Sequence, residues 1–153
     1  MFRIKRTNSE NRDFIKLVKE LDAYLAICDG DEHDFYDQFN KLDAIKNVIV
    51  LYENHVPVGC GAFKKYDRGI AEVKRMYVNA SFRNKGYASE ILRSLEEWAI
   101  ESGFSKLILE TGVRQFEAVN FYRRNGYHPI EKYPPYENMK NSLCFEKILR
   151  INL

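Results

Sequence analysis

The stretch AEVKRMYVNASFRNKGYA, at residues 71–88, constrains the fold of this chain more than any other segment. It predicts a strand, a short basic turn with a glycine, and the start of a helix that continues to about Gly103. The first N–H groups of a helix have no partner within it and lie at the positive end of its dipole, which suits a phosphate group. Arg83 and Lys85 add positive charge to this turn. The stretch therefore predicts an anionic, phosphate-bearing ligand.

Length and composition limit the class of protein. A chain of 153 residues fits one domain, and 45% hydrophobic with 30% charged residues is typical of a globular protein. No apolar run approaches the ~20 residues that span a bilayer, and the N-terminus lacks the apolar core of a signal peptide. We therefore expect one domain over residues 1–153, cytoplasmic and with no membrane partner. The net charge of +2 is too small to indicate a nucleic-acid partner.

Cysteines and histidines are too scattered to predict a metal site. The chain has Cys28, Cys60, Cys144, His33, His55 and His128. An odd number of widely spaced cysteines among apolar or small neighbours predicts buried reduced thiols. Neither Cys60 nor Cys144 has a histidine next to it in sequence, so a covalent route through a cysteine nucleophile is disfavoured. The acidic run at residues 29–34 does not have the ligand spacing of a calcium loop, and we expect no metal.

Hydrophobic periodicity predicts alternating strands and helices along the whole chain. The expected strands are residues 2–6, 48–52, 58–63, 70–78, 106–111, 127–131 and 142–149. The expected helices end near Ile27, cover residues 35–42, run from the Gly86 turn to Gly103, and cover residues 115–125. Thr7 and Glu10 have the spacing of a capping box for the first helix. The order β-α-α-β-β-β-α-β-α-β-β is that of a mixed α/β sheet.

Two motifs in this order resemble the GNAT superfamily of acyl-CoA-dependent N-acyltransferases. The segment Arg83-x-x-Gly86-x-Ala88 lacks the pattern of a Walker loop or of a dinucleotide fingerprint. It is similar to the GNAT signature Arg/Gln-x-x-Gly-x-Gly/Ala, which opens the long central helix. Residues 109–127, with their NFY and NGY segments, are similar to the second conserved half of the family. The resemblance covers essentially the whole chain and implies a small, single-domain, bacterial-type member with splayed central strands.

The resemblance implies acetyl-CoA as the co-substrate and indicates where coenzyme A binding occurs. The pyrophosphate is expected on the backbone of the turn and helix start, at Arg83, Asn84, Lys85, Gly86, Tyr87 and Ala88. The pantetheine arm and the thioester carbonyl are expected along Met76, Tyr77 and Val78, with Asn120 at the pantetheine or the acceptor end. A bulge is expected near Met76 or Tyr77, with few direct bonds from that strand to residues 106–111.

Two residues match the positions of catalytic groups in the family. Transfer to an amine requires loss of an ammonium proton and stabilisation of the leaving thiolate. Glu72 on the central strand is the expected base, directly or through water; the alternative is an ion pair with Lys74 or a nearby arginine. Tyr122 in the NFY segment is the expected acid, because a phenol with a pKa near ~10 is protonated at neutral pH. The alternative for Tyr122 is packing alone.

The amine acceptor is expected on the side opposite the coenzyme, over the first two helices and the loop before the last strand. The candidate residues are Tyr24, Tyr36, Arg75 and Tyr136, with the acids near residue 31. Aromatic walls and acids suit a cationic amine, whereas Arg75 would favour an acceptor that carries a carboxylate. The alternative is that Phe35 and Tyr36 belong to a helix core and that the acids only solvate a loop.

These features predict a transferase, specifically an acetyl-CoA-dependent N-acetyltransferase. The acceptor would be a primary amine of a small molecule, amino acid derivative or peptide, attacked directly in a ternary complex. One alternative is an acyl-CoA sensor without turnover, and another is an unrelated nucleotide-binding α/β protein. The family resemblance alone is compatible with a homodimer through the last strands. The identity of the acceptor does not follow from the sequence.

Overall fold

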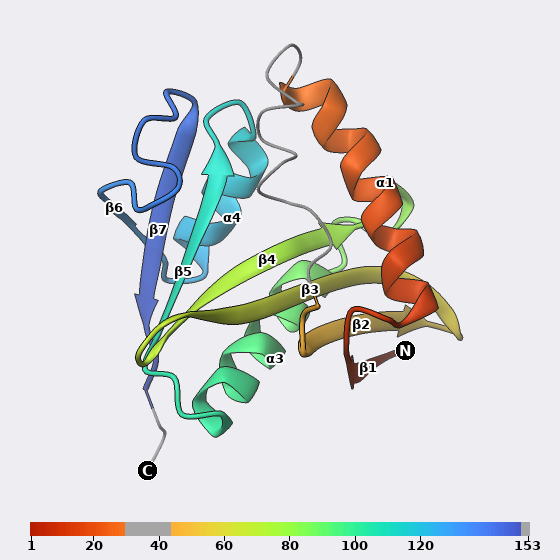
Figure 1. Ribbon diagram of the computed structural model, residues 1–153. Coiled ribbons are helices and arrows are strands. Elements are labelled where there is room, and N and C mark those ends of the chain that lie inside the picture. The colour runs from red at the N-terminus through yellow and green to blue at the C-terminus, as the bar shows by residue number, and fades with distance from the viewer. Residues whose placement is uncertain (30–43, 151–153) are drawn as a thin grey trace.

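Within the described part of the chain, seven strands form one mixed sheet in the order β1-β2-β3-β4-β5-β7-β6 (Figure 1). The computed structural model describes residues 1–29 and 44–150. Its strands are β1 Phe2–Thr7, β2 Asn47–Glu53, β3 Val56–Asp67, β4 Ile70–Val78, β5 Lys106–Gly112, β6 His128–Ile130 and β7 Ser142–Ile148. Its helices are α1 Arg12–Asp29, the short 3-10 helix η2 Ala80–Phe82, α3 Tyr87–Glu101 and α4 Phe116–Arg124. The expected mixed α/β fold is confirmed, and the helix expected at residues 35–42 lies outside the described residues.

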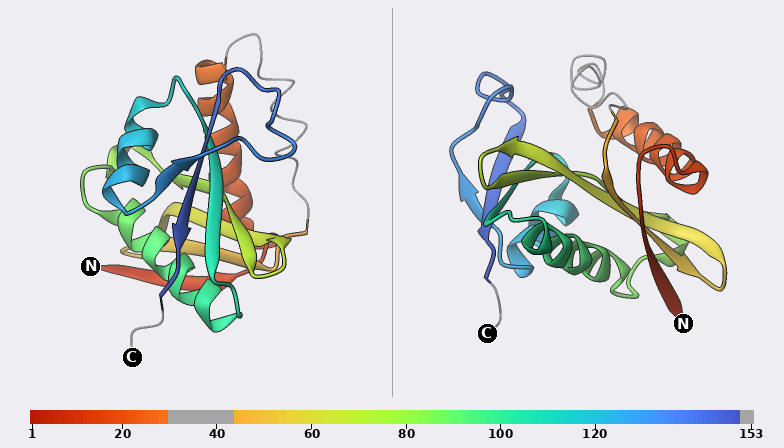
Figure 2. Two further views of the ribbon diagram at one scale, coloured as in Figure 1. Left: turned by 90° about the vertical axis from the view of Figure 1, so that its left-hand side faces the viewer. Right: turned by 60° about the horizontal axis from the view of Figure 1, so that its bottom comes forward.

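Helices cover both faces of the strands β1 to β4, which are antiparallel neighbours. Helix α1 lies on one face and α3 on the other (Figure 2). Phe14, Leu17 and Val18 of α1 pack in one core cluster, whereas Ile91 and Leu95 of α3 pack in another. Because both faces are covered, β2 is an almost continuous apolar run rather than an alternating one.

A bulge and a splay open the middle of the sheet. Ala62 pairs with Lys74 and Cys60 pairs with Tyr77, so two β4 residues, Arg75 and Met76, stand opposite the single Gly61. Arg75 has φ +62°. Strand β4 pairs with β5 only from Ile70 to Glu72, and the two strands then diverge (Figure 1). The expected splay and the expected bulge near Met76 are therefore confirmed.

The start of α1 differs from the expected capping box. Thr7 belongs to β1, where it pairs with Val48, so its side chain does not cap a helix. The Asn11 Oδ1 atom instead accepts a hydrogen bond from the Phe14 backbone N–H at 3.0 Å. The prediction was wrong because a nearer asparagine supplies the cap once the strand extends to Thr7.

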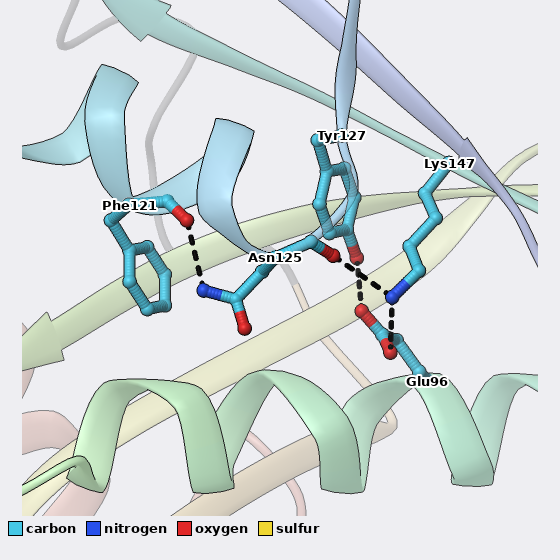
Figure 3. A network of polar contacts seen from close by, with 5 residues as sticks. All are labelled: Glu96, Phe121, Asn125, Tyr127 and Lys147. Carbon is cyan, nitrogen blue, oxygen red and sulfur yellow. Dashed lines mark hydrogen bonds and ion pairs between the residues drawn. The ribbon is translucent and has the colours of Figure 1, made fainter.

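A polar network joins α3, the end of α4 and β7 (Figure 3). Glu96 on α3 accepts hydrogen bonds from the Tyr127 hydroxyl at 2.8 Å and from Lys147 Nζ at 3.0 Å. Lys147 also donates to the Asn125 carbonyl at 2.9 Å, and Asn125 Nδ2 donates to the Phe121 carbonyl at 2.8 Å. The network fixes α4 against its neighbours, although α4 has only nine residues.

Candidate active site

Two adjoining cavities lie along β4 and α4. The first, which we name the turn groove, encloses about 300 Å³. Its lining includes Arg83, Asn84, Gly86, Tyr87, Ala88 and Ser89 of the turn and α3, Tyr77 and Val78 of β4, Phe121 of α4 and Tyr24 of α1. The second, the β4 cavity, encloses about 120 Å³ and is lined by Glu72, Lys74, Arg75, Glu110, Thr111 and Tyr136 among others. Leu21, Met76, Gln115, Ala118 and Tyr122 line both.

The turn groove ends at the first turn of α3, as a phosphate site requires. Gly86 precedes the helix with φ +78°, and a Cβ atom placed there would meet nothing within 4 Å. The backbone on that side is therefore open to a ligand. Asn84 also has a positive φ, +65°, which turns the chain sharply before the helix. Backbone N–H groups at a helix start bind anions, so these residues fit the pyrophosphate of a coenzyme.

The two charged side chains of the turn point to different places: Arg83 lines the turn groove, whereas Lys85 pairs with a residue of β2. Arg83 lines the groove, where its Nε donates to the Val78 carbonyl at 3.1 Å and its guanidinium lies 5.4 Å from the centre of the Tyr24 ring. Lys85 does not line the groove, because its Nζ lies 2.9 Å from a Glu53 carboxylate oxygen on β2. The charge expected from Lys85 is thus offset locally.

Two other candidate residues lie away from their expected places. Tyr24 lines the turn groove beside Arg83 and not the β4 cavity, so it lies with the residues expected to bind the coenzyme and not with those expected to bind the acceptor. Asn120 is exposed and lines neither of the two cavities. Tyr36 lies outside the described residues.

Tyr122 stands on the wall that the two cavities share. Its side chain is 7% exposed and its ring contacts those of Phe121 and Tyr127 at 5.2 and 5.8 Å between centres. Burial raises the pKa of the Tyr122 hydroxyl, and the Glu110 carboxylate adds to the rise. The hydroxyl therefore keeps its proton through the neutral and mildly alkaline range.

Glu72 is a buried carboxylate of the β4 cavity with two partners. Its Oε2 accepts a hydrogen bond from the Tyr133 hydroxyl at 2.7 Å, and its Oε1 lies 3.4 Å from Lys74 Nζ. The ion pair with Lys74 is the alternative weighed from the sequence, yet Glu72 also lines the cavity. The Tyr133 contact joins residues 61 positions apart and had no signal in the sequence. Burial, and then the Glu72 charge, raise the pKa of Tyr133.

Arg75 and Tyr136, two of the residues predicted to contact the acceptor, both line the β4 cavity. Arg75 is buried, and its Nη1 lies 3.5 Å from Asp22 Oδ1 on α1. Burial raises the pKa of Tyr136; the charges of Glu72 and Glu110 add to this rise, whereas that of Arg75 opposes it. The charges of Glu72, Glu110 and Arg75 thus all act on the Tyr136 hydroxyl.

Cys60 does not have the environment of a nucleophile. Cys60 is fully buried and its Sγ donates to the Arg75 carbonyl at 3.3 Å. Burial raises the pKa of the Cys60 thiol, which disfavours the thiolate that a covalent route needs. Within residues 1–29 and 44–150, no group of three His, Cys, Asp or Glu side chains is arranged to hold a metal ion. The helices of that part of the chain are too short or too polar to cross a membrane.

A splayed central strand, an open helix start and a buried tyrosine between two cavities are together the features expected of an acyl-CoA N-acyltransferase fold. Residues 13–127 match the Acetyltransferase (GNAT) family. An IAA acetyltransferase from Azospirillum brasilense is 31% identical over 137 residues, which cover 88% of this chain and 90% of that protein. The chain therefore belongs to the GNAT family of acetyltransferases, and acyl transfer is its class of reaction.

Solved structures agree with this assignment over nearly the full length. A Klebsiella pneumoniae protein assigned as an acyl-CoA N-acyltransferase has a TM-score of 0.83 at 28% identity, with 98% of this chain and 99% of that chain covered. A GNAT family acetyltransferase from Elizabethkingia anophelis, with acetyl-CoA bound, has a TM-score of 0.71 at 16% identity and covers 97% and 98% of the two chains. The second likeness is one of fold alone.

Proposed function

We propose that this chain is an acetyl-CoA-dependent N-acetyltransferase that transfers the acetyl group to a primary amine by direct attack in a ternary complex. The observation that carries the proposal is the position of Tyr122 on the wall shared by the turn groove and the β4 cavity. A donor in one cavity and an acceptor in the other would meet beside this hydroxyl. We further propose that residues 1–153 act as one catalytic domain, because a single sheet contributes to both cavities.

In this proposal the turn groove binds coenzyme A. The backbone of the turn and the start of α3 would hold the pyrophosphate, assisted by Arg83. Met76, Tyr77 and Val78 would present the edge of β4 to the pantetheine arm, since β5 has diverged at that height. The acetyl-CoA bound to the Elizabethkingia anophelis relative supports the choice of this co-substrate.

The proposed reaction uses two residues of this chain. Glu72 accepts the proton of the acceptor ammonium, directly or through water, and the amine nitrogen then attacks the thioester carbonyl carbon. The new C–N bond forms and the C–S bond breaks. Tyr122 donates its proton to the departing thiolate, which leaves as the free thiol. The nitrogen, now bonded to the acetyl carbon, passes its second proton through water to the Tyr122 phenolate, so the product is a neutral amide. Glu72 then releases its proton to solvent. Lys74 and Tyr133 hold the Glu72 carboxylate in place between them.

An acetyl-CoA consumption screen with thiol release as the readout tests this function. The acceptor panel contains polyamines, aminoglycosides, amino acids and peptides, and coenzyme A binding is measured in parallel by calorimetry. We expect turnover with at least one class of amine. Tight binding of coenzyme A with no product would favour the acyl-CoA sensor and contradict the enzyme. Stabilisation by ATP or NAD, and none by coenzyme A, would contradict both.

A further inference from the structure

The bulge in β4 has a chemical consequence for the β4 cavity. In a regular strand, Arg75 would follow Lys74 onto the opposite face, toward α3. The extra residue changes this pattern: Met76 points toward α3, where its Sδ would lie 2.6 Å from a Cβ at Gly61. Arg75 points toward α1, where it approaches Asp22. The bulge therefore places the consecutive cations Lys74 and Arg75 in the same cavity.

Charged side chains of both signs line the β4 cavity in equal number. Two carboxylates, Glu72 and Glu110, face two cations, Lys74 and Arg75. Leu21, Leu25, Val73 and Ala118 supply the apolar part of the wall. An occupant that adds no net charge fits this environment best.

We propose that the acceptor is a free amino acid whose carboxylate is bound by Arg75, while its ammonium faces Glu72 and Glu110. This inference rests on the proposed function, because it names the acceptor of the same site. A guanidinium has five N–H donors in a planar fork that matches a carboxylate. Arg75 lines the β4 cavity while its Nη1 lies 3.5 Å from Asp22 Oδ1, so in this proposal the guanidinium contacts the ligand carboxylate from the cavity wall.

The balanced charges also disfavour other amines. A polyamine or an aminoglycoside would bring several positive charges toward Lys74 and Arg75, where like charges repel. A peptide N-terminus has its nearest carbonyl in a neutral amide, so it would leave Arg75 without the carboxylate that it binds in an amino acid. Arg75 is therefore a specificity-determining residue that discriminates on the carboxylate.

Acetylation kinetics with paired acceptors test the proposal. The panel contains the twenty common L-amino acids, β-alanine, γ-aminobutyrate and the carboxamide of each. We expect one or more amino acids to exceed their carboxamides in kcat/KM by about tenfold or more, the effect of one charge-assisted contact. In Arg75→Gln this preference should disappear, chiefly through KM for the amino acid. Arg68→Gln, which removes an exposed arginine on the turn between β3 and β4, should keep it.

Further measurements separate the possible failures. If Arg75→Gln does not fold, Arg75→Lys retains the charge without the fork and should weaken the preference. Carboxamides that react as well as the amino acids, or a preference unchanged in the Arg75 variants, would overturn the proposal. If no amine at all is acetylated, the proposed function fails. Calorimetry of the coenzyme A complex then decides the inference: amino acids that bind better than their carboxamides support it, and equal binding or none overturns it.

Discussion

The buried environment of Tyr122 keeps its hydroxyl protonated, so the proton is available for donation to the leaving thiolate. Burial raises the pKa of its hydroxyl, so the proton is present across the range in which an amine acceptor is reactive. We predict that Tyr122→Phe lowers kcat about 10²-fold or more, the usual contribution of general acid catalysis. The KM for acetyl-CoA should stay near its wild-type value, because the ring remains. Steady-state kinetics with purified protein measures both quantities.

A second buried tyrosine supplies the control for this variant. Tyr52 on β2 donates to Asp13 at 2.6 Å and lines neither of the two cavities. Burial raises the pKa of Tyr52 to about 12. Tyr52→Phe should cost about 1 kcal/mol of stability through the lost hydrogen bond and leave kcat unchanged. An equal loss of kcat in both variants would show that a hydroxyl matters only for folding, and the assignment of Tyr122 would fall.

The proposed role of Glu72 as the proton acceptor is tested by its amide variant. Glu72→Gln removes the proposed proton acceptor, so kcat/KM should fall about 10²-fold or more near neutral pH. Raising the pH should restore part of this loss, because more of the acceptor then arrives as the free amine. The measurement is kcat/KM against pH for both proteins.

Glu110→Gln is the matched comparison for Glu72→Gln. It removes the same charge from the same cavity, where Glu110 accepts a hydrogen bond from Ser142 Oγ at 2.6 Å. Since Glu110 is not the proposed base, this variant should change KM for the acceptor but retain the wild-type shape of the pH profile. Matching profiles in the two variants would indicate that only cavity charge matters.

At the scale of elements, the glycines at the two ends of α3 allow the effect of an alanine on backbone strain to be distinguished from its effect on coenzyme binding. Gly86 and Gly103 bound α3 at its two ends, with φ of +78° and +92°, and a Cβ would meet nothing within 4 Å at either. Alanine at each position should therefore cost a similar stability, about 1 kcal/mol. Of the two variants, only Gly86→Ala should raise KM for acetyl-CoA, by about tenfold. Its new methyl group would occupy the open side of the turn groove where the pyrophosphate is proposed to bind.

Chemical denaturation and acetyl-CoA kinetics of the two glycine variants test this prediction together. The result expected for Gly103→Ala is a lower midpoint of denaturation with an unchanged KM for acetyl-CoA. If both variants raise KM equally, the effect comes from distortion of the helix. If neither raises it, the pyrophosphate does not lie at Gly86.

The elements themselves were largely predictable from local patterns. Strand β4 has the expected bounds, Ile70–Val78, because alternation and a turn glycine delimit it in the sequence. The bulge was expected only from the family resemblance, since no residue between Lys74 and Tyr77 shows it by type. The prediction of a capping box was wrong because Thr7 pairs with Val48 of β2, and this tertiary contact overrides its local preference for a helix cap.

At the scale of the whole molecule, what the sequence did not reveal is contact between distant segments. The turn signature pointed to Arg83 and Gly86, and both line the turn groove. Lys85 joins Glu53 across 32 positions, and Glu72 joins Tyr133 across 61. Tyr24 lies beside Arg83 because α1 passes along both cavities, which its own sequence does not indicate. A local sequence motif thus predicts a turn that binds a ligand. Which cavity a given side chain lines depends on contacts between distant segments and follows only from the fold.

The buried tyrosines couple the stability of the whole fold to alkaline pH. Burial raises the pKa of Tyr122, Tyr127, Tyr133 and Tyr136 above the ordinary value of 10.0. Below pH ~10 both states hold these protons and their contribution to stability is complete. As the pH rises toward the folded-state pKa values, the unfolded chain loses protons first. The free energy of unfolding should then fall, by up to ~1.4 kcal/mol per pH unit for each such tyrosine.

Urea denaturation at a series of pH values from about 8 to about 11.5 checks this whole-molecule prediction around the tyrosine pKa of ~10. Lysines titrate in the same range, so the informative quantity is the difference between wild type and Tyr133→Phe. The variant lacks one hydroxyl whose pKa is raised in the folded state. Its free energy of unfolding should therefore fall less steeply with pH, and the difference in slope should correspond to about one proton. Its lost hydrogen bond to Glu72 lowers stability at every pH and so shifts the curve without changing its slope. Parallel curves above pH ~10 would mean that Tyr133 ionises as readily in the folded as in the unfolded protein.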